Sequence, residues 1–237
     1  MTVASFVPQV FEQATGKIPT FVSGSTKWLR IVALANTLIQ DWSDEKDVDW
    51  ASLYTPDLNI GTITAAQSFT IPATVRKLSQ QQGNVVRILH VDGTTYIDYE
   101  MVPADRDKDF ASYVRTFQDN YVYQLANKIY FHRAFNSTDP QFGGSLLVPA
   151  YTYAPTITAD SDVIPIDIPN WLVYATAAAY DSTDVTRQQL VPRLEAKANQ
   201  IMEVMKANND GAITDMYRPW QPGSSYSSST NGFLSQL

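Results

Sequence analysis

Cysteine is absent from this chain of 237 residues, and histidine occurs only twice. The absence of cysteine excludes disulfide bonds, thiolate catalysis and zinc or iron–sulfur sites with cysteine ligands. Positive charge is also scarce: 17 Lys and Arg stand against 24 Asp and Glu, for a net charge of −7. Such a chain lacks the basic surface that binding to nucleic acid phosphates requires. We therefore do not expect it to grip nucleic acid electrostatically.

Long hydrophobic runs are missing too. The longest apolar segment, residues 28–39, is interrupted by Arg30, Asn36 and Thr37 and is too short to span a bilayer. The first 16 residues have neither the basic start nor the apolar stretch of a signal peptide. The sequence therefore predicts a soluble protein that is made in a cytoplasm and has no membrane partner.

Motifs for catalysis or metal binding are equally scarce. His90 and His132 lie far apart in strand-like segments, where a packed histidine is a more ordinary interpretation than a metal ligand. Residues 105–109 carry Asp at alternate positions like a calcium loop, but Phe110 replaces the glycine that such a loop requires. The usual metalloprotease, nucleophile-elbow and P-loop motifs do not occur. No catalytic residue, metal or cofactor is predicted.

The first 53 residues contain two helical patterns. Residues 5–15 predict a short helix that is capped by Ser5 and ended by Gly16. Residues 26–44 predict a stronger helix, because apolar residues recur at intervals of three and four. The stripe that we expect to pack against other helices contains Trp28, Val32, Leu38 and Trp42.

From residue 54 the hydrophobic period changes from 3.6 to two, which indicates strands. Segments 85–91 and 94–102 flank Asp92-Gly93, a sequence typical of a two-residue type I′ hairpin turn. A second hairpin is predicted for 121–125 and 128–133, and a further strand for 145–153. These short strands with frequent turn residues favour a small antiparallel sandwich or open barrel within residues 54–160.

Residues 169–209 predict two helices joined by a short polar turn at 181–186, and therefore an antiparallel helical hairpin. Pro192 costs about 3 kcal/mol in a helix interior, so we expect the regular second helix to begin near it. The residues expected to pack this pair against the rest are Trp171, Leu172, Leu194, Ile201 and Met205.

These elements together predict an α+β fold. Its core would be a helical bundle built from both chain ends, 1–53 and 161–210, with an antiparallel β-domain inserted at 54–160. Residues 211–237 predict an extended tail, which is either a disordered terminus or an arm that docks into a partner. Its hydrophobic anchors are Met216, Tyr217, Trp220, Phe233, Leu234 and Leu237.

Two stretches of the chain resemble a known family. The β segments FTIPATVRKL, VRILHVDGTTYIDYEMVPADR and NKIYFHRAF, and the helical run IDIPNWLVYATAAAYDSTDVTRQQLVPRLEAKANQIMEVMKANN, are similar to head-to-tail adaptor (connector) proteins of tailed bacteriophages. The resemblance covers roughly residues 25–210. It consists of packing patterns and includes no chemical signature.

The resemblance implies a structural, non-enzymatic protein in the neck of a virion, assembled in the host cytoplasm. Such proteins form a homo-oligomeric ring, commonly of twelve copies, beneath the portal protein. Residues 210–237 would contact the portal, while the β-domain would face the next tail or neck protein. Double-stranded DNA would pass through the ring without sequence-specific binding, and an electronegative wall would suit that passage.

Two other functions stay open at this point. The β segments are rich in tyrosine, which favours either strand packing or a glycan-binding platform on a virion or cell surface. The tyrosines concerned are Tyr96, Tyr99, Tyr113, Tyr121, Tyr123, Tyr130, Tyr151 and Tyr153. A hydrolase would need a carboxylate pair, for which Asp98, Glu100, Asp105 and Asp107 are the candidates.

Overall fold

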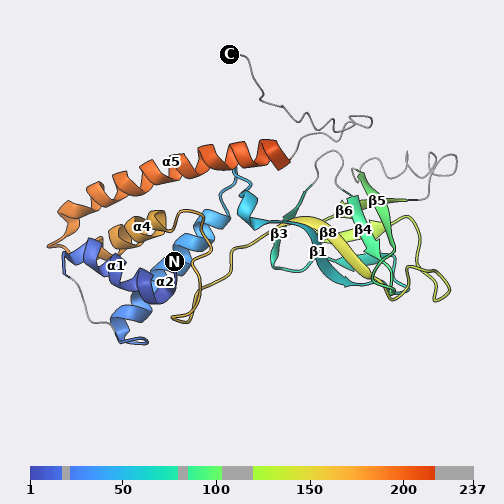
Figure 1. Ribbon diagram of the computed structural model, residues 1–237, viewed down its shortest axis with the longest axis horizontal. Coiled ribbons are helices and arrows are strands. Elements are labelled where there is room, and N and C mark those ends of the chain that lie inside the picture. Colours follow the sequence, from blue (N-terminus) through green and yellow to red (C-terminus); the bar gives the residue numbers. More distant parts are fainter. Residues whose placement is uncertain (18–21, 80–84, 103–119, 217–237) are drawn as a thin grey trace, which may run out of the picture.

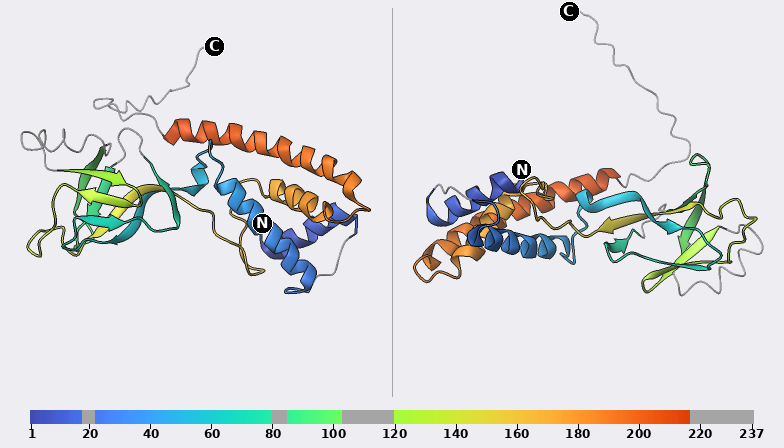
Figure 2. Two further views of the ribbon diagram at one scale, coloured as in Figure 1. Left: turned by 180° about the vertical axis from the view of Figure 1, so that it is seen from behind. Right: turned by 90° about the horizontal axis from the view of Figure 1, so that it is seen from below.

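The computed structural model describes residues 1–17, 22–79, 85–102 and 120–216 (Figure 1). Helices α1 (Val3–Thr15) and α2 (Thr26–Ser43) begin this part of the chain, and α4 (Pro169–Asp181) and α5 (Val191–Met216) end it. Between them lie the short 3₁₀ turn η1 (Ala51–Leu53) and strands β1 (Tyr54–Thr62), β2 (Ser68–Thr70), β3 (Val75–Leu78), β4 (Val85–Leu89), β5 (Tyr96–Val102), β6 (Tyr121–Leu125), β7 (Lys128–Phe131) and β8 (Ser145–Thr152). The helices occupy one end of an elongated molecule and the strands the other (Figures 1 and 2).

The strands form one curled, mixed sheet. Its order is β1-β8-β4-β5-β6-β7-β2, and β3 pairs with the end of β8 beyond β4. All pairs are antiparallel except β5 and β6, which run parallel with Glu100 opposite Tyr121. The curl brings the strands around a shared apolar interior, as in half of a barrel (Figure 2).

The predicted fold class is therefore wrong. The structure is mainly a curled mixed half-barrel accompanied by four helices in its described part, and is not a helical bundle built from both chain ends with an inserted antiparallel domain. Both predicted hairpins, β4–β5 and β6–β7, are present, but β5 and β6, which residues 103–120 separate, run parallel, so the domain is not antiparallel throughout as predicted. The helices also do not pack alone, since Trp50 and Leu53 from the segment before β1 and Ile157 from the segment after β8 belong to the same hydrophobic cluster.

Helix α1 begins earlier than predicted, and Ser5 is not its cap. The N-cap is Thr2, and its side chain makes no capping hydrogen bond. The N–H groups of Val3 and Ala4 instead donate to the carbonyls of Asp162 and Asp160, at 2.9 and 3.1 Å. A distant loop thus satisfies donors that a side chain would otherwise cap. Gly16 ends the helix as predicted, with φ of 68°.

The antiparallel pair α4 and α5 is confirmed, and α5 begins at Val191, next to Pro192, as predicted. A short 3₁₀ turn, η3 (Gln188–Leu190), precedes it. Proline is tolerated there because the first N–H groups of a helix have no partner within it. Helix α5 does not end at Asn209, however, but continues to Met216.

The β4–β5 hairpin is confirmed, but its turn is not the predicted type I′. Of the linking residues 90–95, Gly93 alone has positive φ, at 68°. The Asp92 carboxylate accepts hydrogen bonds from the N–H groups of Thr94 and Thr95, both at 2.9 Å, and from the Thr95 hydroxyl at 2.6 Å. These bonds lower the pKa of Asp92 and stabilise a wider loop than two residues allow.

Two hydrophobic clusters hold the molecule together. The helix cluster includes Phe6, Ile31, Trp42, Leu172 and Met205 and joins all four helices. The sheet cluster fills the curl of the half-barrel. Phe131 lies at its centre, with its ring 5.6, 5.1 and 5.0 Å from those of Phe69, Tyr99 and Phe135, each at a steep angle.

We predict that Phe131→Ala lowers the free energy of unfolding by about 3–5 kcal/mol, because it leaves a cavity among three rings. The control is Leu125→Ala on the neighbouring strand, whose side chain is 55% exposed. That change should cost less than about 0.5 kcal/mol. Urea denaturation measures both, and equal losses would contradict this account of the core.

Candidate interaction surface

The link between α2 and β1, residues 44–53, lies where the helices meet the sheet. Arg76 on β3 reaches this link with a side chain that is only 8% exposed. Its guanidinium donates to the carbonyl of Val48 at 3.0 Å and to that of Glu45. The Asp44 and Asp49 carboxylates lie 3.9 and 4.0 Å from it. We call this link, with its contacts to β3 and α5, the junction.

Helix α5 joins the junction through two side chains. Asn209 is buried, and its amide accepts from the N–H of Ala51 at 2.7 Å and donates to the carbonyl of Asp49 at 3.0 Å. One turn earlier, the Lys206 ammonium lies 3.2 Å from the Glu45 carboxylate. The C-terminal half of α5 is therefore fixed to the same link that Arg76 fixes to the sheet. Helix α5 ends at Met216, about two turns beyond Asn209.

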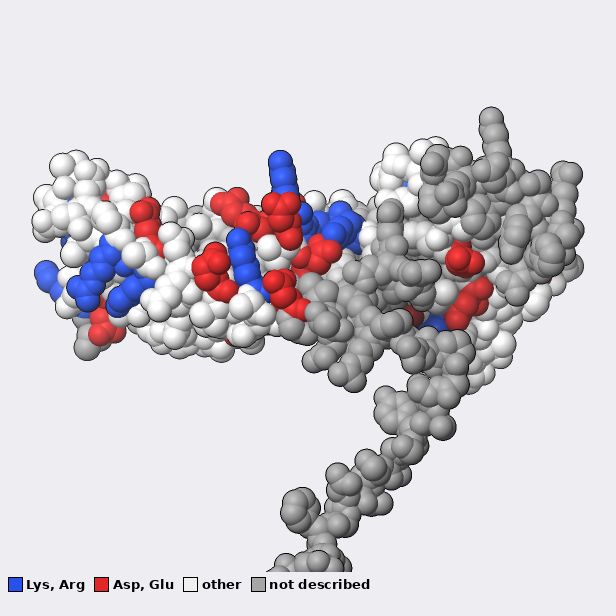
Figure 3. Space-filling model, turned by 90° about the horizontal axis from the view of Figure 1, so that it is seen from above, with Lys and Arg blue, Asp and Glu red and all other residues white. Residues whose placement is uncertain are grey.

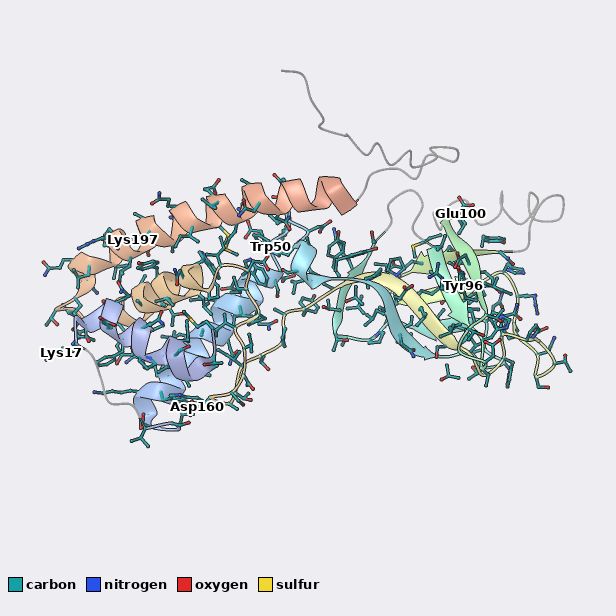
Figure 4. The ribbon with its side chains drawn as sticks, viewed as in Figure 1. Lys17, Trp50, Tyr96, Glu100, Asp160 and Lys197 are labelled. Atoms are coloured by element: carbon teal, nitrogen blue, oxygen red, sulfur yellow. The ribbon has the colours of Figure 1, made fainter. Side chains whose placement is uncertain are left out.

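Tryptophan anchors the junction to the helix cluster. The indole N–H of Trp50 donates to the Trp42 carbonyl at 2.8 Å, and the two rings lie 5.0 Å apart. Trp50 is fully buried (its position is labelled in Figure 4). A hollow of about 190 Å³ lies between Ala51, Ile168 and Met205, and Asn209 also lines it.

We predict that Asn209→Ala lowers the free energy of unfolding by about 1–3 kcal/mol, because the partly buried N–H of Ala51 and carbonyl of Asp49 lose their partner. Asn199→Ala on the same helix is the matched control, since Asn199 is exposed. The control should be neutral or slightly stabilising, because alanine is the better helix former. Thermal unfolding compares them, and a neutral Asn209→Ala would show that the junction does not depend on this side chain.

The turn between α4 and α5 contains a buried carboxylate. Asp181 is fully buried, and the Arg187 guanidinium lies 3.8 Å from it. Burial raises the pKa of Asp181, and Arg187 opposes this shift only in part. Asp184 shows the reverse, because the hydroxyl and the N–H of Thr186 hydrogen-bond its carboxylate and lower its pKa. The two acids of one turn therefore affect stability in opposite directions.

These shifts predict opposite pH effects for two substitutions. A raised pKa in the folded state stabilises at low pH, and this contribution is lost as pH rises through that pKa. Asp181→Asn, which stays neutral, should therefore gain stability relative to the wild type at pH 7 and lose that advantage near pH 4. Asp184→Asn should be less stable than the wild type at pH 7, with a deficit that shrinks as pH falls. Denaturation curves at both pH values measure the two differences, and the same trend in both variants would contradict the assignment.

The residues predicted to pack the helices all belong to the helix cluster or lie against it. Trp28, Val32, Trp42, Trp171, Leu172, Leu194 and Met205 are buried, and Leu38 and Ile201 are partly buried. Of the predicted tail anchors, Met216 is the last residue of α5. Tyr217, Trp220, Phe233, Leu234 and Leu237 lie outside the described residues.

The tyrosines divide between the core and the surface. Tyr99, Tyr121 and Tyr151 are buried, whereas Tyr96 and Tyr153 are exposed. On one face of β6 and β7, the half-buried rings of Tyr123 and Tyr130 stack 5.2 Å apart with an angle of 7° between them. On the same face Tyr121 stacks on His132. Tyr113 lies outside the described residues.

The structure describes only some of the candidate catalytic and metal-binding groups, with Asp98 and Glu100 on the same face of β5. Asp98 is paired with Arg87 at 2.8 Å, and Asp105 and Asp107 lie outside the described residues. His90 follows β4 while His132 follows β7, and these strands are not neighbours. Within the described ranges, no group of three or more His, Asp or Glu side chains is placed to hold a metal ion.

Comparison with known proteins adds no relative. Neither the models of protein families nor the curated proteins contain a match to this chain. Among the described helices, none combines the length and the apolar character needed to cross a membrane.

Sequence reasoning missed the two residues that build the junction. Asn209 stands four residues after Met205, so it continues the buried stripe of α5 with a polar side chain. That interruption is a readable signal, because a buried amide needs hydrogen-bond partners. Arg76 gives no comparable signal, since its partners lie about 30 residues earlier in the chain.

Proposed function

We propose that this protein is a structural head-to-tail adaptor in the neck of a tailed bacteriophage. In this role, copies of the chain form a ring, of about twelve by the family resemblance, beneath the portal protein and around the DNA channel. The half-barrel faces the next tail component, and residues 217–237 contact the portal. The role requires no catalysis and no cofactor.

One observation carries the proposal: the junction fixes the end of α5 to the sheet. Asn209 and Lys206 bind the link that Arg76 also binds, so the last turns of α5 have a defined direction relative to the half-barrel. A tail of 21 residues follows Met216 and carries Trp220, Phe233 and Leu234. An arm with apolar anchors that starts from a rigid body suits docking into a partner's groove.

The charge of the chain supports a conduit for DNA. A net charge of −7 makes a ring of many copies strongly electronegative. Such a wall repels phosphates and lets the duplex slide without binding. The acidic and basic side chains are not mixed evenly, as Figure 3 shows for one face of the molecule.

We predict that the full chain forms a stoichiometric ring complex with its phage's portal protein, and that deletion of residues 217–237 abolishes it. The deletion begins after Met216, so α5 and the junction stay intact. Native mass spectrometry of the mixed proteins measures the complex. A triple substitution of Trp220, Phe233 and Leu234 by alanine should weaken it about as strongly, because aromatic and apolar anchors dominate such contacts.

The matched control replaces three tail serines, Ser225, Ser227 and Ser229, by alanine and should leave the complex unchanged. Retention of full portal binding after deletion of 217–237 would overturn the docking role of the tail. Absence of any portal complex with the full chain would overturn the adaptor function itself.

The stacked Tyr123 and Tyr130 favour a second candidate, a glycan-binding surface on β6 and β7. Their parallel rings are partly exposed, and sugar rings pack on aromatic faces of this kind. A glycan array with the full chain and with Tyr130→Ala tests it. Signal that disappears in the variant would support a glycan role, and an array without signal would end it.

A further inference from the structure

The end of the helical part farthest from the sheet carries net positive charge, with six Lys and Arg residues against Asp184 and Glu195. We call this end, formed by residues 16–17, 22–30 and 182–197, the tip. Its cations include Lys17, Lys27, Arg30, Arg193 and Lys197, and Figure 4 labels the first and the last of them. Within the described part of the chain, none of the five has a carboxylate within 4.0 Å.

Three tip cations lie over aromatic rings instead. Lys27 lies 5.5 Å from the ring centre of Phe11, Arg30 lies 4.7 Å from that of Tyr180, and Lys197 lies 4.9 Å from that of Tyr174. These contacts hold the cations in place without neutralising them. The tip therefore presents positioned positive charge.

Acidic side chains accumulate at the end of α2 and along the middle of α5. Asp41 and Asp47 flank Glu45 in the sequence, and Glu203 lies one turn before Lys206, whose ammonium is 3.2 Å from the Glu45 carboxylate; we call this region, which also contains Lys46, the acidic side. These three carboxylates have no cation within 4.0 Å in the described ranges. Helix α2 alone spans about 27 Å between the two regions, and Figure 3 shows mainly blue side chains at the helical end and most of the red ones nearer the middle, where blue side chains lie among them.

This charge placement is unfavourable for an isolated chain. Both α2 and α5 begin at the tip, and a helix N-terminus favours acids while a C-terminus favours bases. Neither helix has an acid in its first turn or a base in its last. Lys27 and Arg193 instead stand in the first turns, and Asp41 in the last turn of α2. Each of these charges is unfavourable at its helix end, and a partner of opposite charge would offset it.

Exposed apolar residues accompany both regions. At the tip, Leu29 and Val185 are 54% and 82% exposed, and Leu190 is 37% exposed. On the acidic side, Val204 is 49% exposed beside Glu203. Apolar residues bordered by charges are the usual composition of a protein–protein interface.

We propose that copies of this chain associate head to tail, with the tip of one copy against the acidic side of the next. Two tips cannot pair with each other, because like charges would meet. The contact is therefore heterologous, and repetition of a heterologous contact closes into a ring where the rotation allows it. This inference deepens the proposed ring and rests on it.

Charge reversal tests the contact. In one variant the tip is reversed, with Lys27→Glu and Arg193→Glu; in the other the acidic side is reversed, with Asp47→Lys and Glu203→Lys. Sedimentation velocity of the full chain at low salt, about 50 mM, should show association that about 500 mM salt suppresses, because such salt screens exposed charges. Each variant alone should associate at least about tenfold more weakly.

The mixture of the two variants is the decisive sample. The reversed, acidic tip of the first variant faces the reversed, basic side of the second. The unchanged basic tip of the second variant faces the unchanged acidic side of the first. Both contacts join opposite charges, so association should return to the wild-type level. Helix content and unfolding temperature verify that each variant is folded, and the tip reversal should not destabilise because it places acids in two first turns.

Several results would overturn the inference: a wild-type chain that stays monomeric at every concentration at low salt, self-association that survives reversal of the acidic side, or a mixture that fails to associate. None of these results would contradict the adaptor function if the full chain still binds the portal through residues 217–237.

The lack of cysteine allows a second measurement with Leu190→Cys in one copy and Val204→Cys in another. A short bismaleimide should join these two copies, and preferential joining of Leu190→Cys to itself would contradict the head-to-tail arrangement.

Discussion

The Arg76 guanidinium is the contact on which the arrangement of this molecule depends. It is nearly buried, donates to two carbonyls of the link between α2 and β1, and lies near two carboxylates. A guanidinium presents several donors in a fixed plane, so one side chain can define the path of an irregular segment. Trp50 of that segment packs in the helix cluster. The Ala51 N–H and the Asp49 carbonyl of the same segment hydrogen-bond the side chain of Asn209 on α5. The helices and the half-barrel thus share one polar attachment between two separate hydrophobic clusters.

This attachment explains how a chain with few local signals acquires a definite shape. The helix cluster and the sheet cluster each bury their own apolar side chains, and neither determines the direction of the other. Burial is roughly proportional to area and has no direction. Hydrogen bonds from Arg76 and Asn209 do have direction. The orientation of α5, and with it the starting point of the C-terminal tail, follows from these few bonds.

Much of the local structure was predictable from the sequence, whereas its assembly was not. The stripe from Trp28 to Trp42 predicted α2 within one residue, and Pro192 marked the beginning of α5, because periodicity and proline act locally. The parallel pairing of β5 with β6 has no local signature, since it depends on where residues 103–120 return the chain. The prediction that Ser5 caps α1 was wrong for the same reason. Carbonyls about 160 residues away accept hydrogen bonds from the first N–H groups of the helix, in place of a capping side chain. Asn209 could have been noticed as a polar break in an apolar stripe, but its partners could not.

The pairing of β1 with β8 has a consequence for synthesis on the ribosome. Tyr54 on β1 lies opposite Tyr151 on β8, so nearly 100 further residues must be synthesised before β1 can pair with its neighbouring strand. Thr2 pairs with Val163 in the same way, and the helix cluster needs Leu194 and Met205 from still later in the chain. Contacts between distant residues form slowly because long loops must close first. The sheet therefore cannot close before β8 has been synthesised, and the helix cluster cannot form before Met205 has followed it.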